Sequence, residues 1–118
     1  AFYCSPFADS ATLTLDGVGE FATTTMGTAS SDGISIRREL HFPHSVGLLY
    51  SAFTAFLGFE VNEGEYKVMG MAPYGQPRYV EQIDKVVTRN IDGSIWLDPS
   101  FFPYHYSTGR SFTNKFIK

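Results

Sequence analysis

The sequence is poor in several features that mark common classes of protein. It has a single cysteine, Cys4, which excludes an internal disulfide and any metal site built from several cysteines. No apolar run approaches the roughly 20 residues that a membrane helix requires, and no basic start followed by an apolar core marks a signal peptide. We therefore expect a cytoplasmic protein that does not enter a membrane.

Clustered positive charge is also absent. The net charge is −3, and Arg37 and Arg38 are the only neighbouring basic residues. Proteins that bind nucleic acids gather lysine and arginine along one face, so no nucleic-acid partner is expected. The sequence also lacks a P-loop, a GxGxxG motif and a Ser-His-Asp arrangement, and so offers no self-contained set of catalytic residues.

Apolar and aromatic residues, by contrast, are plentiful. The 118 residues are 43% hydrophobic and 16% aromatic, with eleven phenylalanines and seven tyrosines. Such a chain has enough apolar mass for a folded core, which a disordered tail does not. The aromatic excess predicts either a strongly aromatic core or surfaces that something else covers.

The first part of the chain has the pattern of a β-meander. Residues 1–8 are typical of the end of a helix that stops before Pro6. In the alternating segment that follows, Leu13 and Leu15 share one face. Three strands joined by tight turns are predicted, at residues 11–15, 21–29 and 34–40. They would form an antiparallel sheet at one edge of a larger sheet.

The pattern then changes to helical spacing. Ser45 is a suitable N-cap for a helix that runs to Gly58. The helix carries apolar residues on all its sides, so we expect it to be buried on several of them. In so short a chain this burial favours a homo-oligomer. Pro77 is placed as the first residue of a second helix over 77–90, and residues 94–98 predict a short strand.

Residues 16–20, DGVGE, are the first candidate for a ligand site. Around Asp16, Gly17 and Gly19 the backbone N–H groups can face a phosphate without a Cβ in the way. The same Asp-Gly pair is also the commonest two-residue hairpin turn, so a purely structural turn is the alternative.

His44 is the second candidate, because it precedes a helix N-terminus, where anions are favoured. A neutral imidazole there could donate to a phosphate or carbonyl oxygen, or it could simply cap and pack. His41 and His44 have HxxH spacing, but Pro43 between them prevents a shared helical face, so a zinc site is a poor interpretation.

The third candidate is the glycine- and proline-rich segment 64–75, GEYKVMGMAPYG. Lys67 could pair with a phosphate or a carboxylate of a ligand, or with Glu65 or Glu63 of its own chain. Glycines here would allow a ligand to approach the backbone closely. A binding site and a structural turn both fit this segment.

Taken together, four blocks of the sequence closely resemble one family, the O-carbamoyltransferases that modify nodulation factors, cephamycin-type and aminoglycoside antibiotics. The resemblance extends from residue 1 to about 80 and continues more loosely through DGSIWLD and FTNKF. The four blocks, in order, are SPF at 5–7, LTLDGVGE at 13–20, FPHSVGLLYSAFTAFLGF at 42–59 and GEYKVMGMAPYG at 64–75.

The resemblance implies a fold and a place in it. The fold class is then α/β, or α+β within this piece, an antiparallel three-strand meander with helices inside an actin-like, ribonuclease-H-like nucleotide-binding domain. Residues 1–118 would form part of that domain, cut at both ends, without the family's carbamoyl-adenylate-forming domain. The family's metal-binding histidines lie just ahead of the AFYxSPF segment, so no metal ligand is expected here.

The resemblance also implies an activity. ATP and carbamoyl phosphate would give carbamoyl-adenylate and pyrophosphate, and the actin-like domain would transfer the carbamoyl group to a hydroxyl of a small molecule, with iron polarising the acyl-adenylate. Without the second domain, these residues alone would be inactive, and neither the acceptor nor the catalytic residues can be read from them. The residues that match the family's motifs at the nucleotide are Asp16, Gly17, Gly19, Glu20, His44, Ser45, Glu65, Lys67 and Gly70.

Two other functions remain open. The exposed aromatic residues could make the chain a non-catalytic interaction module that associates with itself or with a partner chain. A phosphotransferase similar to the sugar kinases would share the fold, but the residues of the GEYKVMG block do not support this function.

Overall fold

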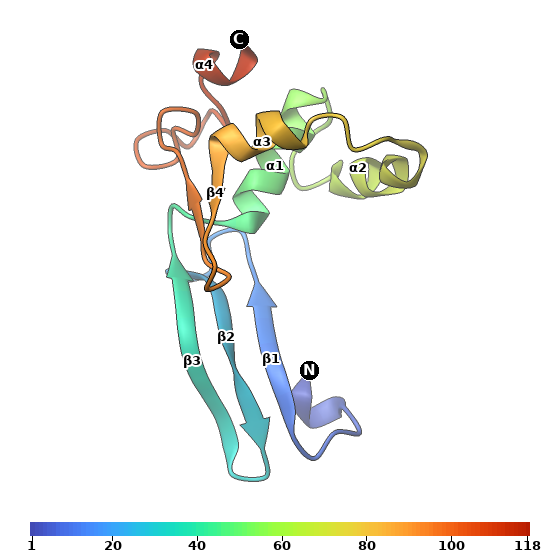
Figure 1. Ribbon diagram of the computed structural model, residues 1–118, viewed down its shortest axis with the longest axis vertical. Coiled ribbons are helices and arrows are strands. Elements are labelled where there is room, and N and C mark those ends of the chain that lie inside the picture. Colours follow the sequence, from blue (N-terminus) through green and yellow to red (C-terminus); the bar gives the residue numbers. More distant parts are fainter.

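The computed structural model describes residues 1–118 and shows an antiparallel sheet that projects from a group of helices (Figure 1). The sheet has the order β1-β2-β3, in which each strand pairs with the next one along the chain. A short 3-10 helix, η1, precedes it at the N-terminus. The bounds are η1 Phe2–Cys4, β1 Ser10–Leu15, β2 Ala22–Ser30 and β3 Gly33–His41.

The predicted three-strand meander is confirmed, but only one of its two turns is tight. Ser31 and Asp32 join β2 to β3, and Gly33 follows them with a φ of 122°, which only glycine adopts readily. The first connection is instead the longer loop of residues 16–21, called here the 16–21 loop. The predicted helix end at 1–8 is limited to the single turn η1.

The helix predicted after Ser45 is confirmed as α1, Val46–Phe56. The Ser45 hydroxyl accepts a hydrogen bond from the Leu48 N–H at 3.0 Å, which is the expected cap. The expected burial on several sides is wrong, since only Ala52 and Thr54 of α1 are buried. The apolar side of α1 that carries Phe56 is only partly covered, since Phe56 stays 46% exposed although its ring contacts Phe112 and Phe116 of the C-terminal segment.

The second half contains four short helices and a small hairpin. These elements are α2 Glu65–Met71, η2 Ala72–Tyr74, α3 Val80–Val86, β4 Val87–Arg89, β5 Ile95–Leu97 and α4 Asn114–Ile117. The helix predicted over 77–90 is correct only for α3. It ends at Val86 because the β-branched Val87 and Thr88 pair with Leu97 and Trp96 of β5. The predicted strand at 94–98 is confirmed.

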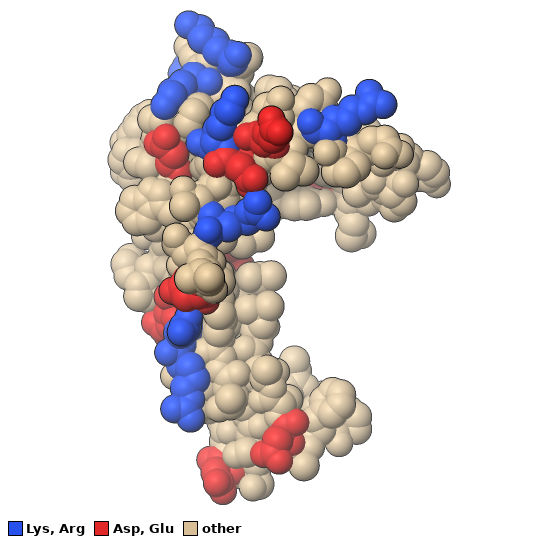
Figure 2. Space-filling model, viewed as in Figure 1, with Lys and Arg blue, Asp and Glu red and all other residues tan.

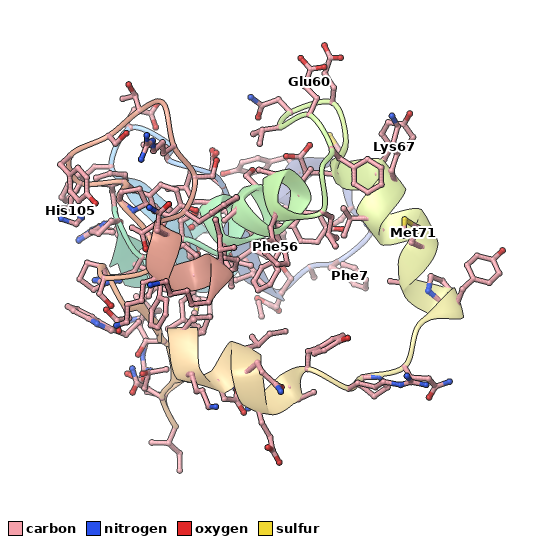
Figure 3. The ribbon with its side chains drawn as sticks, turned by 90° about the horizontal axis from the view of Figure 1, so that it is seen from above. Phe7, Phe56, Glu60, Lys67, Met71 and His105 are labelled. Atoms are coloured by element: carbon pink, nitrogen blue, oxygen red, sulfur yellow. The ribbon has the colours of Figure 1, made fainter.

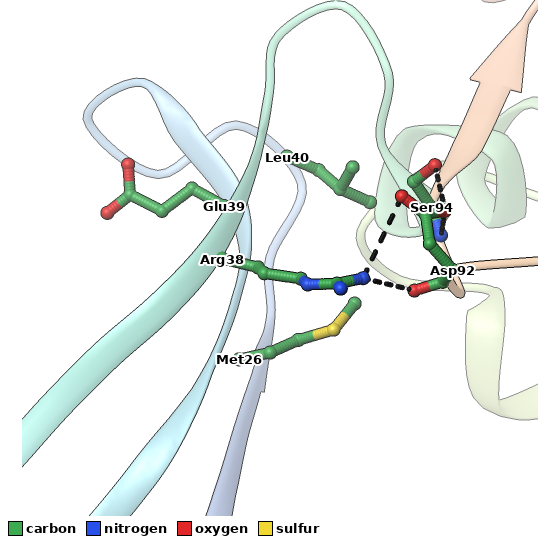
Figure 4. A pocket seen from close by; sticks show the side chains of 6 residues that line it. All are labelled: Met26, Arg38, Glu39, Leu40, Asp92 and Ser94. Carbon is green, nitrogen blue, oxygen red and sulfur yellow. Dashed lines mark hydrogen bonds and ion pairs between the residues drawn. The ribbon is translucent and has the colours of Figure 1, made fainter.

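The core is small and lies between α1, the β4-β5 hairpin and the C-terminal segment. It consists of Ala52, Val86, Val87, Leu97 and Phe102. The sheet receives little cover, so that even Leu13 of β1 is 62% exposed. Arg38 of β3 joins the sheet to the hairpin through a 2.8 Å hydrogen bond to the Asp92 carbonyl (Figure 4). No helix has the length and apolar character needed to cross a membrane.

Candidate functional site

The 16–21 loop is held against the N-terminal end of α1. The Asp16 N–H donates to the Thr23 carbonyl at 2.9 Å, which closes the base of the loop. The Ser45 hydroxyl donates to the Asp16 carbonyl at 2.9 Å while it accepts from Leu48. Ser45 is 0% exposed, so both of its hydrogen bonds are shielded from water. One side chain therefore caps the helix and fixes the loop.

Gly47 allows this contact to be as close as it is. A Cβ at Gly47 would lie 2.6 Å from the Asp16 carbonyl oxygen and 2.8 Å from the Gly17 nitrogen. Real Cβ atoms do not approach backbone atoms to such distances, so any other residue would push the loop away from α1. Gly19 serves the loop differently, with a φ of 61° that favours glycine.

The outer part of the loop presents backbone donors to solvent. The Gly17 N–H donates to its neighbour's carboxylate, Asp16 Oδ1, at 2.6 Å. The N–H groups of Val18, Gly19 and Glu20 make no hydrogen bond within the chain. A Cβ at Gly17 would meet no atom within 4 Å, so this side of the loop is open. Successive free N–H groups of this kind can bind the oxygen atoms of a phosphate.

His44 lies behind the loop, where it is part of the packing. Its Nδ1 accepts a hydrogen bond from the Leu97 N–H at 3.1 Å, and its ring lies against that of Trp96, with centroids 3.8 Å apart and the planes tilted by 31°. The His44 carbonyl accepts from the Thr23 hydroxyl at 2.6 Å. Burial lowers the pKa of His44 below its usual 6.5, because desolvation disfavours the charged ring.

Glu65 belongs to a second contact on α1. Its carboxylate accepts from the Asn62 N–H at 3.0 Å and from the Ser51 hydroxyl at 3.2 Å, and its carbonyl accepts from the Tyr50 hydroxyl. These hydrogen bonds, chiefly that of Asn62, lower the pKa of Glu65 below its ordinary value of 4.5. Glu65 thus ties the start of α2 to the middle of α1.

Lys67 and Gly70 lie away from the 16–21 loop and from the Glu65 contact. The Lys67 ammonium lies 5.8 Å from the centroids of both the Phe59 and Tyr66 rings, and Figure 3 shows Lys67 at the outer edge of α2. A Cβ at Gly70 would meet no atom within 4 Å. The two candidates therefore lie on the free surface of α2, the helix that projects sideways in Figure 1.

The loop and Glu65 nevertheless share one face of α1. Gly47, which touches the loop, is separated by three and four residues from Tyr50 and Ser51, which bind Glu65. Residues at this spacing lie on the same side of a helix, about one 5.4 Å turn apart. The structure thus brings Asp16, Gly17, Gly19 and Ser45 together, sets Glu65 one turn away, and leaves Glu20 exposed with no hydrogen bond.

Sequence reasoning missed two residues of this arrangement, Gly47 and Thr23. A glycine in the first turn of a helix was the available signal for Gly47, because glycine weakens a helix unless a close contact requires it. Thr23 had no signal, since it sits among three consecutive threonines in a strand where threonine is ordinary.

The chain holds no group of three histidine, cysteine, aspartate or glutamate side chains that could bind a metal ion. These residues alone therefore do not fit the iron that the family resemblance implies, and the resemblance places the ligands of that iron largely outside them. Charge is also sparse on the hollow face between the sheet and α2 (Figure 2). An apolar pocket of about 600 Å³ lies apart from the loop, between α1, α3 and α4.

Comparison with known proteins identifies the family. The sequence model described as "Carbamoyltransferase N-terminus" matches residues 1–116. The chain belongs to this carbamoyltransferase family. The resemblance seen in the four sequence blocks is thereby confirmed, and the carbamoyltransferase match covers the 16–21 loop, α1 and α2 alike.

Three relatives of this chain were found. It is 50% identical over 116 residues to the uncharacterized protein sll1178 of Synechocystis sp. This alignment covers 98% of the chain and 18% of sll1178. It is 43% identical over 79 residues to the nodulation protein NolNO of Sinorhizobium fredii, an alignment that covers 65% of the chain and 11% of NolNO. It is 42% identical over 84 residues to the nodulation protein NolO of Bradyrhizobium diazoefficiens, an alignment that covers 69% of the chain and 15% of NolO. The chain thus spans less than a fifth of each relative.

Proposed function

We propose that the chain is part of an ATP-dependent O-carbamoyltransferase that moves a carbamoyl group from carbamoyl phosphate, through carbamoyl-adenylate, to a hydroxyl of a small molecule. In this proposal residues 1–118 contribute one wall of an actin-like nucleotide-binding domain. Membership of the carbamoyltransferase family supports the type of reaction. The nucleotide, the intermediate and the domain type follow from the resemblance of the four sequence blocks.

The single observation that carries the proposal is the construction of the 16–21 loop. Hydrogen bonds from Asp16 to the buried residues Ser45 and Thr23 and the close contact at Gly47 fix the base of the loop, while the N–H groups of Val18, Gly19 and Glu20 remain free. A rigid base also suits a purely structural turn, but a ligand site additionally uses the row of free donors that the base holds in place. Donors fixed in advance bind a developing negative charge without the cost of ordering them.

The chemistry assigned to the loop is the stabilisation of a leaving group. The acceptor's hydroxyl oxygen attacks the carbamoyl carbon and gives up its proton to water, the bond from that carbon to the phosphate oxygen of carbamoyl-adenylate breaks, and AMP leaves with the electron pair. Backbone N–H groups beside this phosphate would stabilise the negative charge that it gains. The carboxylates of Asp16 and Glu20 belong to the same loop, and Asp16 Oδ1 accepts from the Gly17 N–H, so the proposed phosphate donors are those of Val18, Gly19 and Glu20.

Gly17→Ala in the complete enzyme tests this role. A Cβ at Gly17 meets no atom of the chain and Gly17 does not require a positive φ, so the variant should fold normally. It would place a methyl group on the open side of the loop, where the phosphate is proposed to bind. Gly109→Ala is the matched control, because a Cβ there also meets nothing and the position lies outside the proposed site.

We expect Gly17→Ala to slow carbamoyl transfer at least about tenfold, a loss of roughly 1.4 kcal/mol of transition-state stabilisation. In Gly17→Ala the rate of the single-turnover pyrophosphate burst from ATP and carbamoyl phosphate should stay within twofold of the wild-type rate. In Gly109→Ala the rates of both pyrophosphate release and carbamoyl transfer should stay within twofold of wild type. Equal transfer rates in the two variants would remove the loop from the phosphate site. If in addition nucleotide moved no amide signal of residues 16–20 and the protein self-associated, the interaction module would be the better function.

A further inference from the structure

The imidazole of His44 is held from two directions by groups that do not titrate. Its Nδ1 accepts from the Leu97 N–H at 3.1 Å, and its ring lies against Trp96. Leu97 is 2% exposed, so water cannot easily replace this hydrogen bond. The ring therefore joins β5 to the turn that precedes α1.

This hydrogen bond decides which nitrogen carries the proton. A backbone N–H only donates, so Nδ1 must be unprotonated and the neutral ring carries its hydrogen on Nε2. A protonated ring would place an N–H at Nδ1 against the N–H of Leu97, and the bond would be lost. Burial lowers the pKa of His44, which keeps the ring neutral at physiological pH.

The main chain of His44 is connected to the 16–21 loop through a closed set of hydrogen bonds. The His44 carbonyl accepts from the Thr23 hydroxyl, and the Thr23 carbonyl accepts from the Asp16 N–H at 2.9 Å. On the other side Ser45, the next residue, donates to the Asp16 carbonyl. Thr23 is 1% exposed, so this circuit is buried at both Thr23 and Ser45. A movement of His44 is transmitted to both ends of Asp16.

We propose that His44 is a positioning residue whose neutral imidazole anchors the base of the 16–21 loop to β5, so that protonation of the ring releases the loop and weakens phosphate binding. The proposal rests on the phosphate-binding role of that loop.

The other titratable groups nearby are engaged with partners of their own. Glu39 and His41 of β3 are paired at 3.0 Å. Asp98, which follows β5, accepts from the Ser100 N–H at 2.8 Å. The Asp16 carboxylate accepts from Gly17. None of these side chains bonds to the His44 ring, which leaves that ring as the group that changes the Leu97 contact as the pH falls.

His44→Asn is the decisive variant, since the Asn oxygen occupies the place of Nδ1, accepts from Leu97 and does not titrate. His44→Leu removes the acceptor, and His41→Asn is the control for a histidine three residues away. The probe is AMP, and its dissociation constant is measured between pH 5 and pH 8 in the complete protein. Imidazole nitrogen signals and the amide signals of Val18, Gly19 and Glu20 are followed by NMR over the same range.

We expect the wild type and His41→Asn to lose about tenfold in AMP affinity per pH unit below the pKa of His44, which itself lies below 6.5. His44→Asn should keep only the pH dependence that the AMP phosphate, with its second pKa of about 6, gives to every variant, and His44→Leu should bind weakly at every pH. A proton on Nδ1 at neutral pH, or an unchanged acid limb in His44→Asn, would overturn the proposal. If AMP never bound while the loop amides followed the titration of His44, positioning would stand and the phosphate role would fail.

Discussion

Gly47→Ala tests the contact on which the loop depends. The added methyl carbon would lie 2.6 Å from the Asp16 carbonyl oxygen and 2.8 Å from the Gly17 nitrogen. Both obstacles are backbone atoms, so no side chain can rotate away, and loop and helix must separate by several tenths of an ångström. Overpacking of this kind typically costs about 1–3 kcal/mol. Separation also lengthens the Ser45–Asp16 hydrogen bond, whose net contribution is of order 1 kcal/mol.

The same substitution has a favourable part, because alanine stabilises a helix by up to about 1 kcal/mol relative to glycine. Gly70→Ala isolates this part, since Gly70 lies in α2 and a Cβ there meets nothing. We expect the free energy of unfolding to fall by about 1–3 kcal/mol in Gly47→Ala and to rise by up to about 1 kcal/mol in Gly70→Ala.

Urea denaturation, followed by the fluorescence of Trp96, measures both variants. Amide signals of residues 16–20 should shift in Gly47→Ala and stay in place in Gly70→Ala. If Gly47→Ala unfolded at the same urea concentration as Gly70→Ala or a higher one, with unchanged loop signals, the 16–21 loop would not lie against α1 as described.

Two further predictions concern single hydrogen bonds. Tyr104→Phe should lower the free energy of unfolding by about 1 kcal/mol in urea denaturation, because the Tyr104 hydroxyl donates to the Leu48 carbonyl at 2.6 Å; unchanged stability would mean that this bond contributes nothing. Ser51→Ala should raise the pKa of Glu65 toward 4.5 in a carboxyl NMR titration, since it removes one hydrogen bond to the ionised form; the Glu65 contact is present above this pKa and lost as the pH falls through it, and an unmoved pKa would exclude the Ser51 contribution.

Much of the local structure was predictable. Alternation and threonine content indicated the three strands, and the Ser45 cap indicated α1, because these signals act within a few residues of the chain. The helix predicted over 77–90 failed at Val87, where pairing with Leu97 outweighed helical spacing. The prediction of a tight turn between β1 and β2 failed for a similar reason. The Asp-Gly pair suggested a tight turn, but contact with α1 favours the longer 16–21 loop.

The candidate residues divide in the same way. Asp16, Gly17, Gly19 and Ser45 are brought to one place, as the sequence blocks suggested. Nothing local could show that Lys67 lies against Phe59 and Tyr66 on the outside of α2. Neither could the sequence show that the His44 ring is used by Leu97, since these residues meet only when the β4-β5 hairpin packs on α1.

The sequence by itself determined the three strands of the meander, the capped helix, a loop rich in glycine and the family to which the chain belongs. Those properties depend on side-chain periodicity and on residue identity along the chain. Only the tertiary structure decided that Gly47 must lack a side chain, that Thr23 and Ser45 fix Asp16, and that the His44 ring accepts from Leu97. Each of these depends on atoms far apart in sequence, whose distances exist only once the sheet, α1 and the hairpin have packed together.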